Sequence, residues 1–159
     1  MSTGGWVRGS GMQKNILLLD DDPSVRQMLR RVLAEEGYRV LPVADGAEAL
    51  SSVSANAMDL ALLDLNLPGD DGWNIFEELS KSDPLLPIMI ITARSNQLFR
   101  ALAAGAAALM EKPLDFPKLL ETIRELLSET AAVRAARVAG RKTGFHYHAP
   151  TADNPASRS

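Results

Sequence analysis

The chain has 159 residues, of which 46% are hydrophobic and 23% charged, and it contains no cysteine. This length is enough for one domain with a sizeable core, and the composition is that of an ordinary globular protein. The lack of cysteine excludes disulfide bonds and thiolate metal sites. No apolar run reaches the roughly 18 residues that a membrane span needs, and the N-terminus lacks the basic and then apolar plan of a secretory signal. We therefore expect no membrane contact and a cytoplasmic location.

The net charge of −3 is unevenly distributed. Residues 14–130 carry 11 Lys and Arg against 19 Asp and Glu, a net charge of −8. Residues 131–159 carry five basic side chains against one acidic one, a net charge of +4, and Arg8 supplies the last positive charge. A domain with this net negative charge is not typical of nucleic-acid-binding modules, and we expect no direct nucleic-acid contact.

The N-terminal part of the chain predicts a leader followed by a strand and a helix. Residues 1–13 are rich in Gly and Ser, and we expect a flexible leader or an expression remnant that lies outside the fold. Residues 15–19 form a continuous apolar run, too short for a helix, which ends at three consecutive aspartates and predicts a buried parallel strand. Pro23 suits the first turn of the helix that follows, and Gly37 ends it.

Two further strands follow in the next part of the sequence. Residues 38–43 predict the second strand, and an Asp-Gly turn leads from it into a short helix. Residues 58–63 predict a third strand that is buried on both faces and ends at Asp64. A loop rich in Pro, Gly and Asp then leads to a helix that begins at Gly72, and we interpret Asp70 and Asp71 as turn residues in this loop.

The last two predicted strands also end in polar residues. Residues 88–91 predict a fourth strand that ends at Thr92, and a helix follows it. Residues 107–110 predict a fifth, weaker strand, which leads to Lys112. Asp115 then caps a long amphipathic helix.

Five strands that alternate with five helices indicate an α/β fold, a doubly wound parallel sheet with helices on both faces. We assign this domain to residues 14–130. Residues 131–159 form a basic tail that could first extend the last helix and is expected to be disordered from Gly144 onward. His146 and His148 are interpreted as part of this tail and not as metal ligands.

The C-terminal ends of parallel strands meet at one edge of a sheet, which is where such folds bind ligands. The predicted strands bring Asp20, Asp21, Asp64, Thr92 and Lys112 to that edge. Carboxylates about 4 Å apart repel by roughly 4 kcal/mol per pair at an effective dielectric constant of 20, so such a cluster indicates a bound cation. Oxygen ligands without His or Cys favour Mg²⁺, and a cation beside a lysine and a hydroxyl suits a phosphoryl group. Asp64 stands alone on the central strand and is the candidate nucleophile.

The sequence resembles the receiver domain of bacterial two-component response regulators over about residues 14–128. Four motifs in the order of the predicted strands carry the resemblance: Leu19-Asp20-Asp21-Asp22, Leu63-Asp64-Leu65-Asn66-Leu67-Pro68 with Asp71-Gly72, Ile91-Thr92-Ala93 and Glu111-Lys112-Pro113. The resemblance implies a flavodoxin-like, five-stranded parallel sheet with the strand order 2-1-3-4-5.

The resemblance also implies a role for each site residue. Asp64 would be phosphorylated, Thr92 would donate a hydrogen bond to the phosphoryl oxygen, and Lys112 would pair with it. The implied Mg²⁺ ligands are Asp21, Asp64 and the backbone carbonyl of Asn66, with Asp20 acting through water. A cis peptide bond before Pro113 is implied as well.

As a response regulator, the chain would be a stand-alone receiver in a two-component phosphorelay, and not an enzyme beyond its own phosphotransfer and dephosphorylation. A histidine kinase or a histidine phosphotransfer protein would be the donor. The output would be a protein contact on the last two strands and the adjoining helices, and the chain could form a homodimer. Leu109 departs from the family, which usually has Tyr or Phe there, and Asn66 and Arg94 occupy positions that tune dephosphorylation in the family.

Two alternatives stay open at this point. The first is an aspartyl-phosphate hydrolase of the haloacid dehalogenase type, in which Asp20 would be the nucleophile and Asp22 the second acid. The second is a pseudo-receiver that binds partners without phosphorylation, which Leu109 leaves open. The simplest reading of residues 20–22 is helix capping, although capping accounts for one aspartate more readily than for three.

Overall fold

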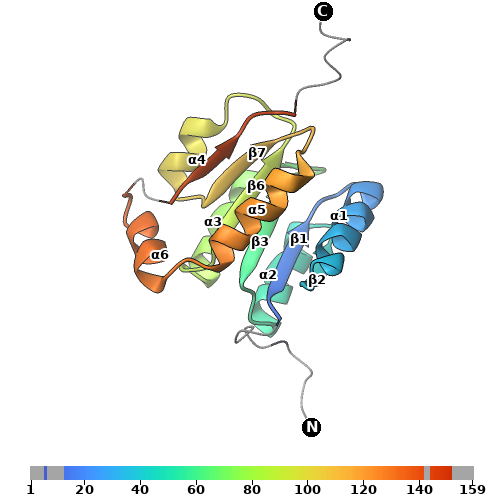
Figure 1. The fold of residues 1–159 in the computed structure, drawn as a ribbon, viewed down its shortest axis with the longest axis horizontal. Coiled ribbons are helices and arrows are strands. Elements are labelled where there is room, and N and C mark those ends of the chain that lie inside the picture. The colour runs from blue at the N-terminus through green and yellow to red at the C-terminus, as the bar shows by residue number, and fades with distance from the viewer. Residues whose placement is uncertain (1–5, 7–12, 142–143, 152–159) are drawn as a thin grey trace, which may run out of the picture.

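A parallel sheet runs through the middle of the structure, and helices cover both of its faces (Figure 1). The computed structural model describes Trp6 and residues 13–141 and 144–151. All neighbouring strands in the sheet are parallel. Their spatial order is β2 (Arg39–Val43), β1 (Asn15–Leu19), β3 (Leu60–Asp64), β6 (Ile88–Thr92), β7 (Ala108–Glu111) and β8 (His146–His148).

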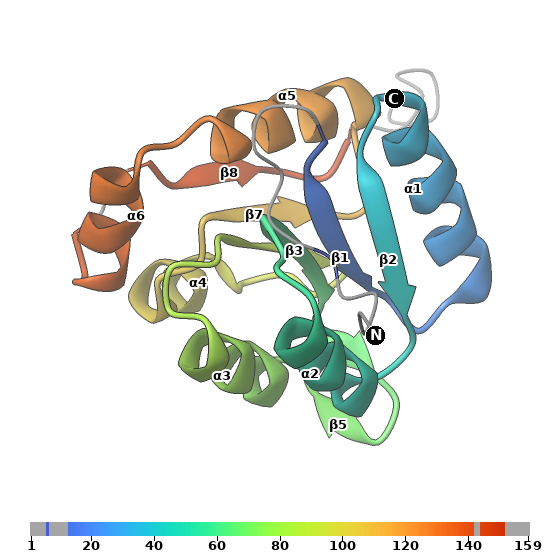
Figure 2. The same cartoon turned by 90° about the horizontal axis from the view of Figure 1, so that it is seen from below.

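The helices form two layers, one on each side of the sheet (Figure 2). One layer consists of α1 (Pro23–Glu35) and α5 (Phe116–Leu127). The other consists of α2 (Gly46–Ala55), α3 (Gly72–Ser82) and α4 (Leu98–Ala104). A further helix, α6 (Ala131–Val138), follows α5 and lies near the C-terminal end of α4. Within the described part of the chain, none of these helices is long and apolar enough to cross a lipid bilayer.

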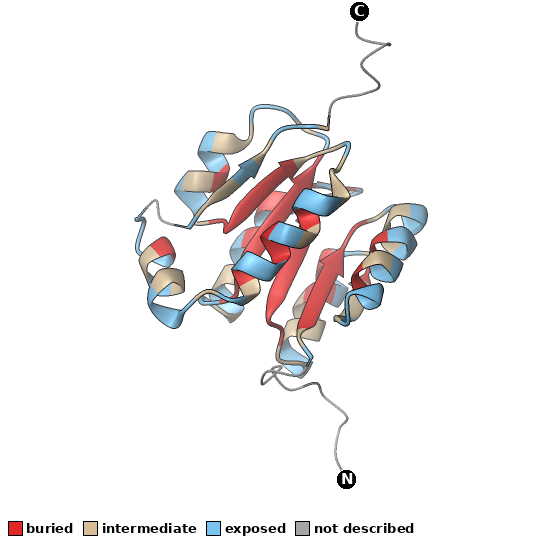
Figure 3. Cartoon of the chain, viewed as in Figure 1, coloured by how far each residue is buried: buried red, intermediate tan, exposed pale blue. Residues whose placement is uncertain are grey.

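The sheet has a separate hydrophobic core on each face, because successive side chains of a strand point to opposite sides. Leu17 and Leu19 of β1 belong to the core beneath α2, α3 and α4. Ile16 and Leu18 belong to the core beneath α1 and α5. The central strands are therefore buried on both faces (Figure 3), which explains why they read as continuous apolar runs in the sequence.

Aspartates that follow the strands fix the starts of the next helices. Each of them accepts a hydrogen bond from a backbone N–H of the first helical turn, which satisfies a donor that the helix itself leaves unpaired. These capping residues are Asp22 for α1, Asp45 for α2, Asp71 for α3 and Asp115 for α5. These hydrogen bonds attach the loops at the C-terminal edge of the sheet to the helices that follow them.

The doubly wound α/β class is confirmed, and the first five strands of the main sheet have the expected order. The expectation of a five-stranded sheet is wrong by one strand, since β8 extends the sheet beyond β7. The loop after Asp64 also contains a small antiparallel hairpin, formed by β4 (Asn66–Leu67) and β5 (Asp70–Asp71).

The tail differs from its predicted description in two ways. Residues 131–138 do not extend α5 but form the separate helix α6, whose start is capped by Thr130. Where disorder was expected from Gly144 onward, residues 146–148 form β8, and the structure describes the chain through residue 151. Composition suggested disorder because the strand is short and polar. Its pairing with β7 is a non-local interaction that local composition does not reveal.

Trp6 packs against the fold, although residues 1–13 were expected to lie outside it. Its backbone N–H donates to Asn56 Oδ1 at 2.8 Å, and its carbonyl accepts from the N–H of Ala57 at 2.7 Å. The guanidinium carbon of Arg39 lies 4.4 Å from the centre of the Trp6 ring. The other residues of the expected leader, apart from Gln13, lie outside the described residues, as do residues 152–159 of the tail.

Candidate functional site

Three carboxylates meet at the C-terminal edge of the sheet. Asp20 and Asp21 follow β1, and Asp64 is the last residue of the neighbouring strand β3. Each offers a carboxylate oxygen, and these oxygens lie within 4.8 Å of one another. Asp20 and Asp64 are almost fully buried, and Asp21 is half-buried. Sequence segments more than 40 residues apart thus build one acidic cluster.

Lys112 reaches into this cluster from the end of β7. Its Nζ lies 3.2 Å from Asp20 Oδ2 and 3.1 Å from Asp64 Oδ2. The backbone N–H of Lys112 donates to the carbonyl of Thr92 at 2.8 Å, and the Lys112–Pro113 peptide bond is cis, as the resemblance implied. The ammonium therefore bridges the two buried carboxylates.

The charges of these groups shift one another's pKa values. Burial raises the pKa of the Asp64 carboxyl group above its ordinary value, while the N–H of Asn66 and the Lys112 ammonium oppose this rise and Asp20 adds to it. Burial by itself would lower the pKa of Lys112, but the carboxylates of Asp64 and Asp20 raise it overall, so the lysine stays charged.

The cluster carries an excess of negative charge that suits a divalent cation. Three carboxyl groups and one ammonium give the cluster a formal charge of −2. At 4.8 Å and an effective dielectric constant of 20, each pair of carboxylates still repels by about 3.5 kcal/mol. All candidate ligands are oxygens, which is the donor set that Mg²⁺ prefers. The residues present therefore fit the expected metal.

Backbone hydrogen bonds hold the acidic side chains in place. Asp64 Oδ1 accepts from the N–H of Asn66 at 2.9 Å, and Asp20 Oδ1 accepts from the N–H of Asp22 at 2.9 Å. In both cases the bond spans two residues, so the loop after each strand orients the carboxylate before it. The guanidinium of Arg26 donates to the carbonyl of Asp20 at 2.7 Å and ties α1 to the same loop.

Thr92 and Arg94 border the cluster on the side of β6. Thr92 is fully buried, and its Oγ1 accepts from the N–H of Arg94 at 2.9 Å. The side chain of Arg94 crosses to the loop after β3, where its Nε donates to Asn66 Oδ1 at 2.7 Å and its Nη2 to the carbonyl of Leu65 at 3.3 Å. The sequence singled out Arg94 by its position but gave no sign of this bridge between two loops.

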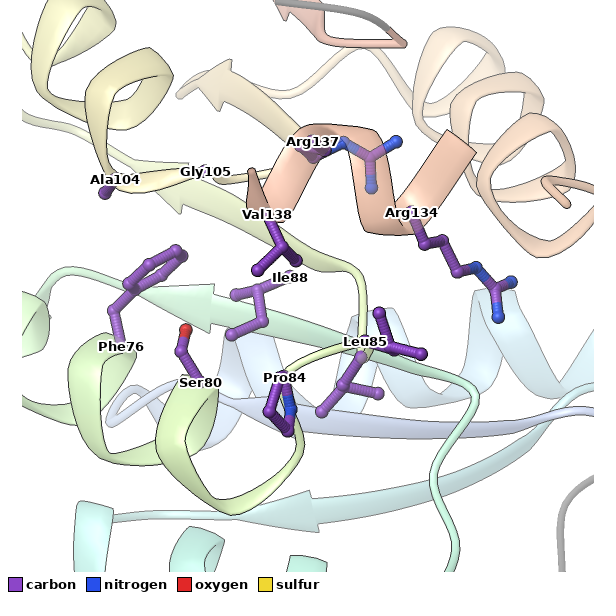
Figure 4. Close-up of a pocket in the computed structure, with 11 residues that line it drawn as sticks. Phe76, Ser80, Pro84, Leu85, Ile88, Ala104, Gly105, Arg134, Arg137 and Val138 are labelled. Atoms are coloured by element: carbon purple, nitrogen blue, oxygen red, sulfur yellow. The ribbon is translucent and has the colours of Figure 1, made fainter. Parts of the chain in front are cut away.

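Two features bear on the hydrolase alternative. Asp22, which would supply the second acid, caps α1 instead, since its Oδ1 accepts from the N–H groups of Ser24 and Val25. A cavity of about 80 Å³ lies between the ends of α3, α4 and α6, at the opposite end of β6 from Thr92 (Figure 4), and no residue of the acidic cluster lines it. Neither feature therefore supports a hydrolase site at the acids.

Other residues singled out in the sequence lie away from the cluster. Leu109 is buried in the core between β6 and β8. His146 and His148 lie on β8, where His146 Nδ1 is 3.3 Å from Glu125 Oε2 and His148 Nε2 is 2.8 Å from Thr122 Oγ1. Within the described residues, the three aspartates form the one group of metal-ligating side chains that meets at such short range.

Comparison with known proteins gives a consistent result. Residues 16–124 match the family model described as the response regulator receiver domain. The chain is 38% identical over 122 residues to the response regulator MprA of Mycobacterium sp. (strain KMS), covering 76% of this chain and 53% of MprA. It is also 38% identical over 123 residues to the transcriptional regulatory protein ZraR of Klebsiella oxytoca, covering 76% of this chain and 28% of ZraR. The chain thus spans about half or less of the length of these relatives.

Solved structures resemble this fold over most of the described chain. A CheY-like receiver domain protein from Methanospirillum hungatei JF-1 superposes with a TM-score of 0.69 at 32% identity, covering 72% of this chain and 94% of that one. The response regulator TrrA from Thermotoga maritima, solved in complex with Mg(2+)-BeF, superposes with a TM-score of 0.66 at 32% identity, covering 71% and 98%.

Proposed function

Because the chain belongs to the family of response regulator receiver domains, we propose that Asp64 accepts a phosphoryl group from the phosphohistidine of a histidine kinase or a phosphotransfer protein. The observation that carries this proposal is the cluster of Asp20, Asp21 and Asp64 around the Lys112 ammonium, with its uncompensated charge of −2. Asp64 is the member that ends the central strand β3, at the middle of the site.

The metal ligands of the proposal are Asp21, Asp64 and the backbone carbonyl of Asn66, with Asp20 acting through water. A bound Mg²⁺ would neutralise the carboxylates and the negative charge of the incoming phosphoryl group. The proposal is supported by the all-oxygen donor set of the cluster and by TrrA, a relative whose crystal structure contains Mg(2+)-BeF.

The transfer itself uses the carboxylate of Asp64 as the nucleophile. One of its oxygens forms a bond to phosphorus while the phosphorus–nitrogen bond of the phosphohistidine breaks, and the imidazole leaves with the electron pair. Lys112, already within 3.1 Å of the carboxylate, pairs with the phosphoryl oxygens, and the Thr92 hydroxyl donates a hydrogen bond to one of them. The chain is thus a phospho-acceptor in a two-component phosphorelay and not a classical enzyme.

The output is a phosphorylation-dependent protein contact. The acyl phosphate carries nearly two negative charges at pH 7 in place of the single charge of the Asp64 carboxylate, and these charges lie on the phosphoryl oxygens. The change biases the loops that hold Thr92 and Lys112 toward a second arrangement. These loops lead into α4 and α5, so the surface formed by the last strands and these helices presents the signal to a target protein or to a second copy of the chain.

Incubation with Mg²⁺ and acetyl phosphate tests the proposal. Intact-mass measurement should show the gain of one phosphoryl group, and both Asp64→Ala and the removal of Mg²⁺ with EDTA should abolish it. Asp45→Asn is the matched control, because Asp45 also follows a strand and caps a helix but lies outside the acidic cluster. Failure of the unmodified chain to gain mass, or an undiminished gain in Asp64→Ala, would overturn the assignment.

A further inference from the structure

The tail of the chain adds the strand β8 to the exposed edge of β7 (Figure 1). The two strands are parallel, and the N–H of His146 donates to the carbonyl of Ala107 at 3.2 Å. Tyr147 lies beside Leu109 in the register. The edge of the receiver sheet is therefore occupied by a segment of the same chain.

A buried ion pair holds the root of this tail. Arg137 of α6 is almost fully buried and pairs with Glu129, which follows α5. Arg137 Nη2 also donates to the carbonyl of Gly144 at 3.4 Å, just before β8 begins. Breaking a buried charge pair is costly, so α6 and Gly144 form a fixed anchor from which the strand extends.

The strand itself is held by much weaker contacts. None of its three residues is buried. Beyond the backbone pairing, three side-chain contacts hold it: the Tyr147 hydroxyl donates to Glu111, His146 approaches Glu125, and His148 contacts the buried Thr122. Short elements with few buried contacts open at low free energy, so β8 can leave β7 while the root of the tail stays in place.

One contact of β8 leads directly to the acidic cluster. The Tyr147 hydroxyl bonds the carboxylate of Glu111, and the next residue in the chain is Lys112. Glu111 also lies beside Thr92 in the pairing of β6 with β7. A displacement of Lys112 therefore also moves Glu111, whose carboxylate accepts the hydrogen bond from Tyr147.

We propose that β8 is a detachable edge strand whose docking on β7 opposes phosphorylation of Asp64 and is loosened by it. This inference rests on the proposed function. In the unmodified site the Lys112 ammonium is positioned by the charges of Asp20 and Asp64. In an acyl phosphate the Asp64 carboxyl group is no longer ionised, and the negative charge lies farther out, on the phosphoryl oxygens.

The best position for the ammonium consequently moves outward. Lys112 and its neighbour Glu111 adjust together, and the hydrogen bond from Tyr147, which fits the unmodified arrangement, is weakened. Linkage requires the reverse effect as well: if phosphorylation loosens β8, the docked β8 lowers the equilibrium constant for phosphorylation of Asp64 by the same factor. The tail thereby regulates the acceptor site without touching the acids.

Amide hydrogen exchange on the full chain measures the docking. The His146 N–H, which pairs with β7, should exchange at least about fivefold faster after treatment with Mg²⁺ and acetyl phosphate, a factor at the lower end of typical coupling between sites. The N–H of Ala61 in β3, which donates to the carbonyl of Pro87 directly before β6, is the internal reference and should not change.

Tyr147→Phe separates this inference from the proposed function. The substitution removes only a hydroxyl from a side chain that is 42% exposed, so the fold is preserved. We expect the His146 amide to exchange faster before any modification, and the phosphorylated fraction at limiting acetyl phosphate to rise. Phe99→Leu is the control. Phe99 and Tyr147 line one surface cleft, and Phe99 is 84% exposed. Its substitution should change neither the exchange of the His146 amide nor the phosphorylated fraction.

The outcomes distinguish this inference from the proposed function. If the chain gains no phosphoryl group under any condition, the proposed function fails and this inference fails with it. If the unmodified chain gains the group but the His146 amide exchanges at the same rate before and after, or Tyr147→Phe leaves the phosphorylated fraction unchanged, the inference alone is wrong.

Discussion

Gly72, the first residue of α3, lies against the backbone of the loop that follows Asp64. Its N–H donates to the carbonyl of Leu65 at 3.2 Å. A Cβ atom at this position would lie 2.4 Å from the Cα and 2.7 Å from the carbonyl oxygen of Leu65. These are backbone atoms and cannot rotate away, so in Gly72→Ala either the start of α3 or the loop must move.

The size of the effect follows from two opposing contributions. Overpacking a closely packed site costs about 1–3 kcal/mol, and a clash with backbone places Gly72→Ala at the upper end. Alanine restricts the unfolded chain and returns about 0.4–1 kcal/mol. The free energy of unfolding should therefore fall by about 2 kcal/mol, which corresponds to a decrease in Tm of roughly 4–8 °C for a chain of this size.

Binding of Mg²⁺ should weaken in the same variant. Leu65 lies between Asp64 and Asn66, whose carboxylate and backbone carbonyl are proposed ligands, and displacement of residues that support a metal ligand typically costs tenfold or more in affinity. We expect a loss of about tenfold, measured by calorimetry or by the fluorescence of Trp73.

Gly37→Ala is the matched control for this experiment. Gly37 has a φ of 91°, and a Cβ there would meet no atom within 4 Å. Its replacement incurs only the cost of a left-handed backbone, about 1–2 kcal/mol, and should leave Mg²⁺ affinity unchanged. Urea unfolding gives the stabilities. A Gly72→Ala variant with undiminished stability and unaltered Mg²⁺ affinity would refute the close packing of α3 against the acceptor loop.

Three further predictions concern charged groups. Lys112→Met leaves the buried carboxylates without their ammonium and should lower the free energy of unfolding by about 3 kcal/mol in EDTA, with much of the loss restored by Mg²⁺; a loss that Mg²⁺ does not reduce would contradict the metal site. Arg137→Met leaves the buried Glu129 carboxylate with only the longer contact to Arg134 Nε at 3.9 Å and should cost about 3 kcal/mol in urea unfolding, whereas a loss below about 1 kcal/mol would show that the root of the tail is not anchored by the pair with Arg137. Burial, and next the charge of Lys118, lower the pKa of His148 from 6.5, so the released tail binds more protons than the docked tail. β8 should therefore dock fully above pH 6.5 and loosen as the pH falls below it. Amide exchange of β8 checks this, and His148→Gln should remove the pH dependence that comes from His148.

The acidic edge of the sheet was predictable because it depends on topology. Parallel strands all point the same way, so residues at their ends must meet. Asp20, Asp64 and Thr92 each directly follow an apolar run, and Lys112 follows one after Glu111. The distances between side chains and the bridging position of the Lys112 ammonium required the structure, since the sequence fixes which loops meet but not how far each side chain reaches.

The features that the sequence did not predict are non-local. The strand β8 forms only because the edge of β7 is available to pair with it, and Trp6 is held by Asn56, Ala57 and Arg39, which lie far away in sequence. The local composition of β8 and of the residues around Trp6 does not show which distant residues they will contact. Asp22 shows the opposite case: its spacing from Asp20 suggested the second acid of a hydrolase, whereas its side chain caps α1.

The position of β8 at the margin of the sheet also bears on how the protein behaves at high concentration. At the other margin, β2 contains Pro42, which has no N–H to donate, and the exposed Arg39, and both discourage pairing between molecules. The stretch Ala108-Leu109-Met110 in β7 has no such protection and would present an apolar ladder to neighbouring chains if β8 were missing. A chain shortened to end after α5 should therefore aggregate at concentrations that leave the intact chain clear.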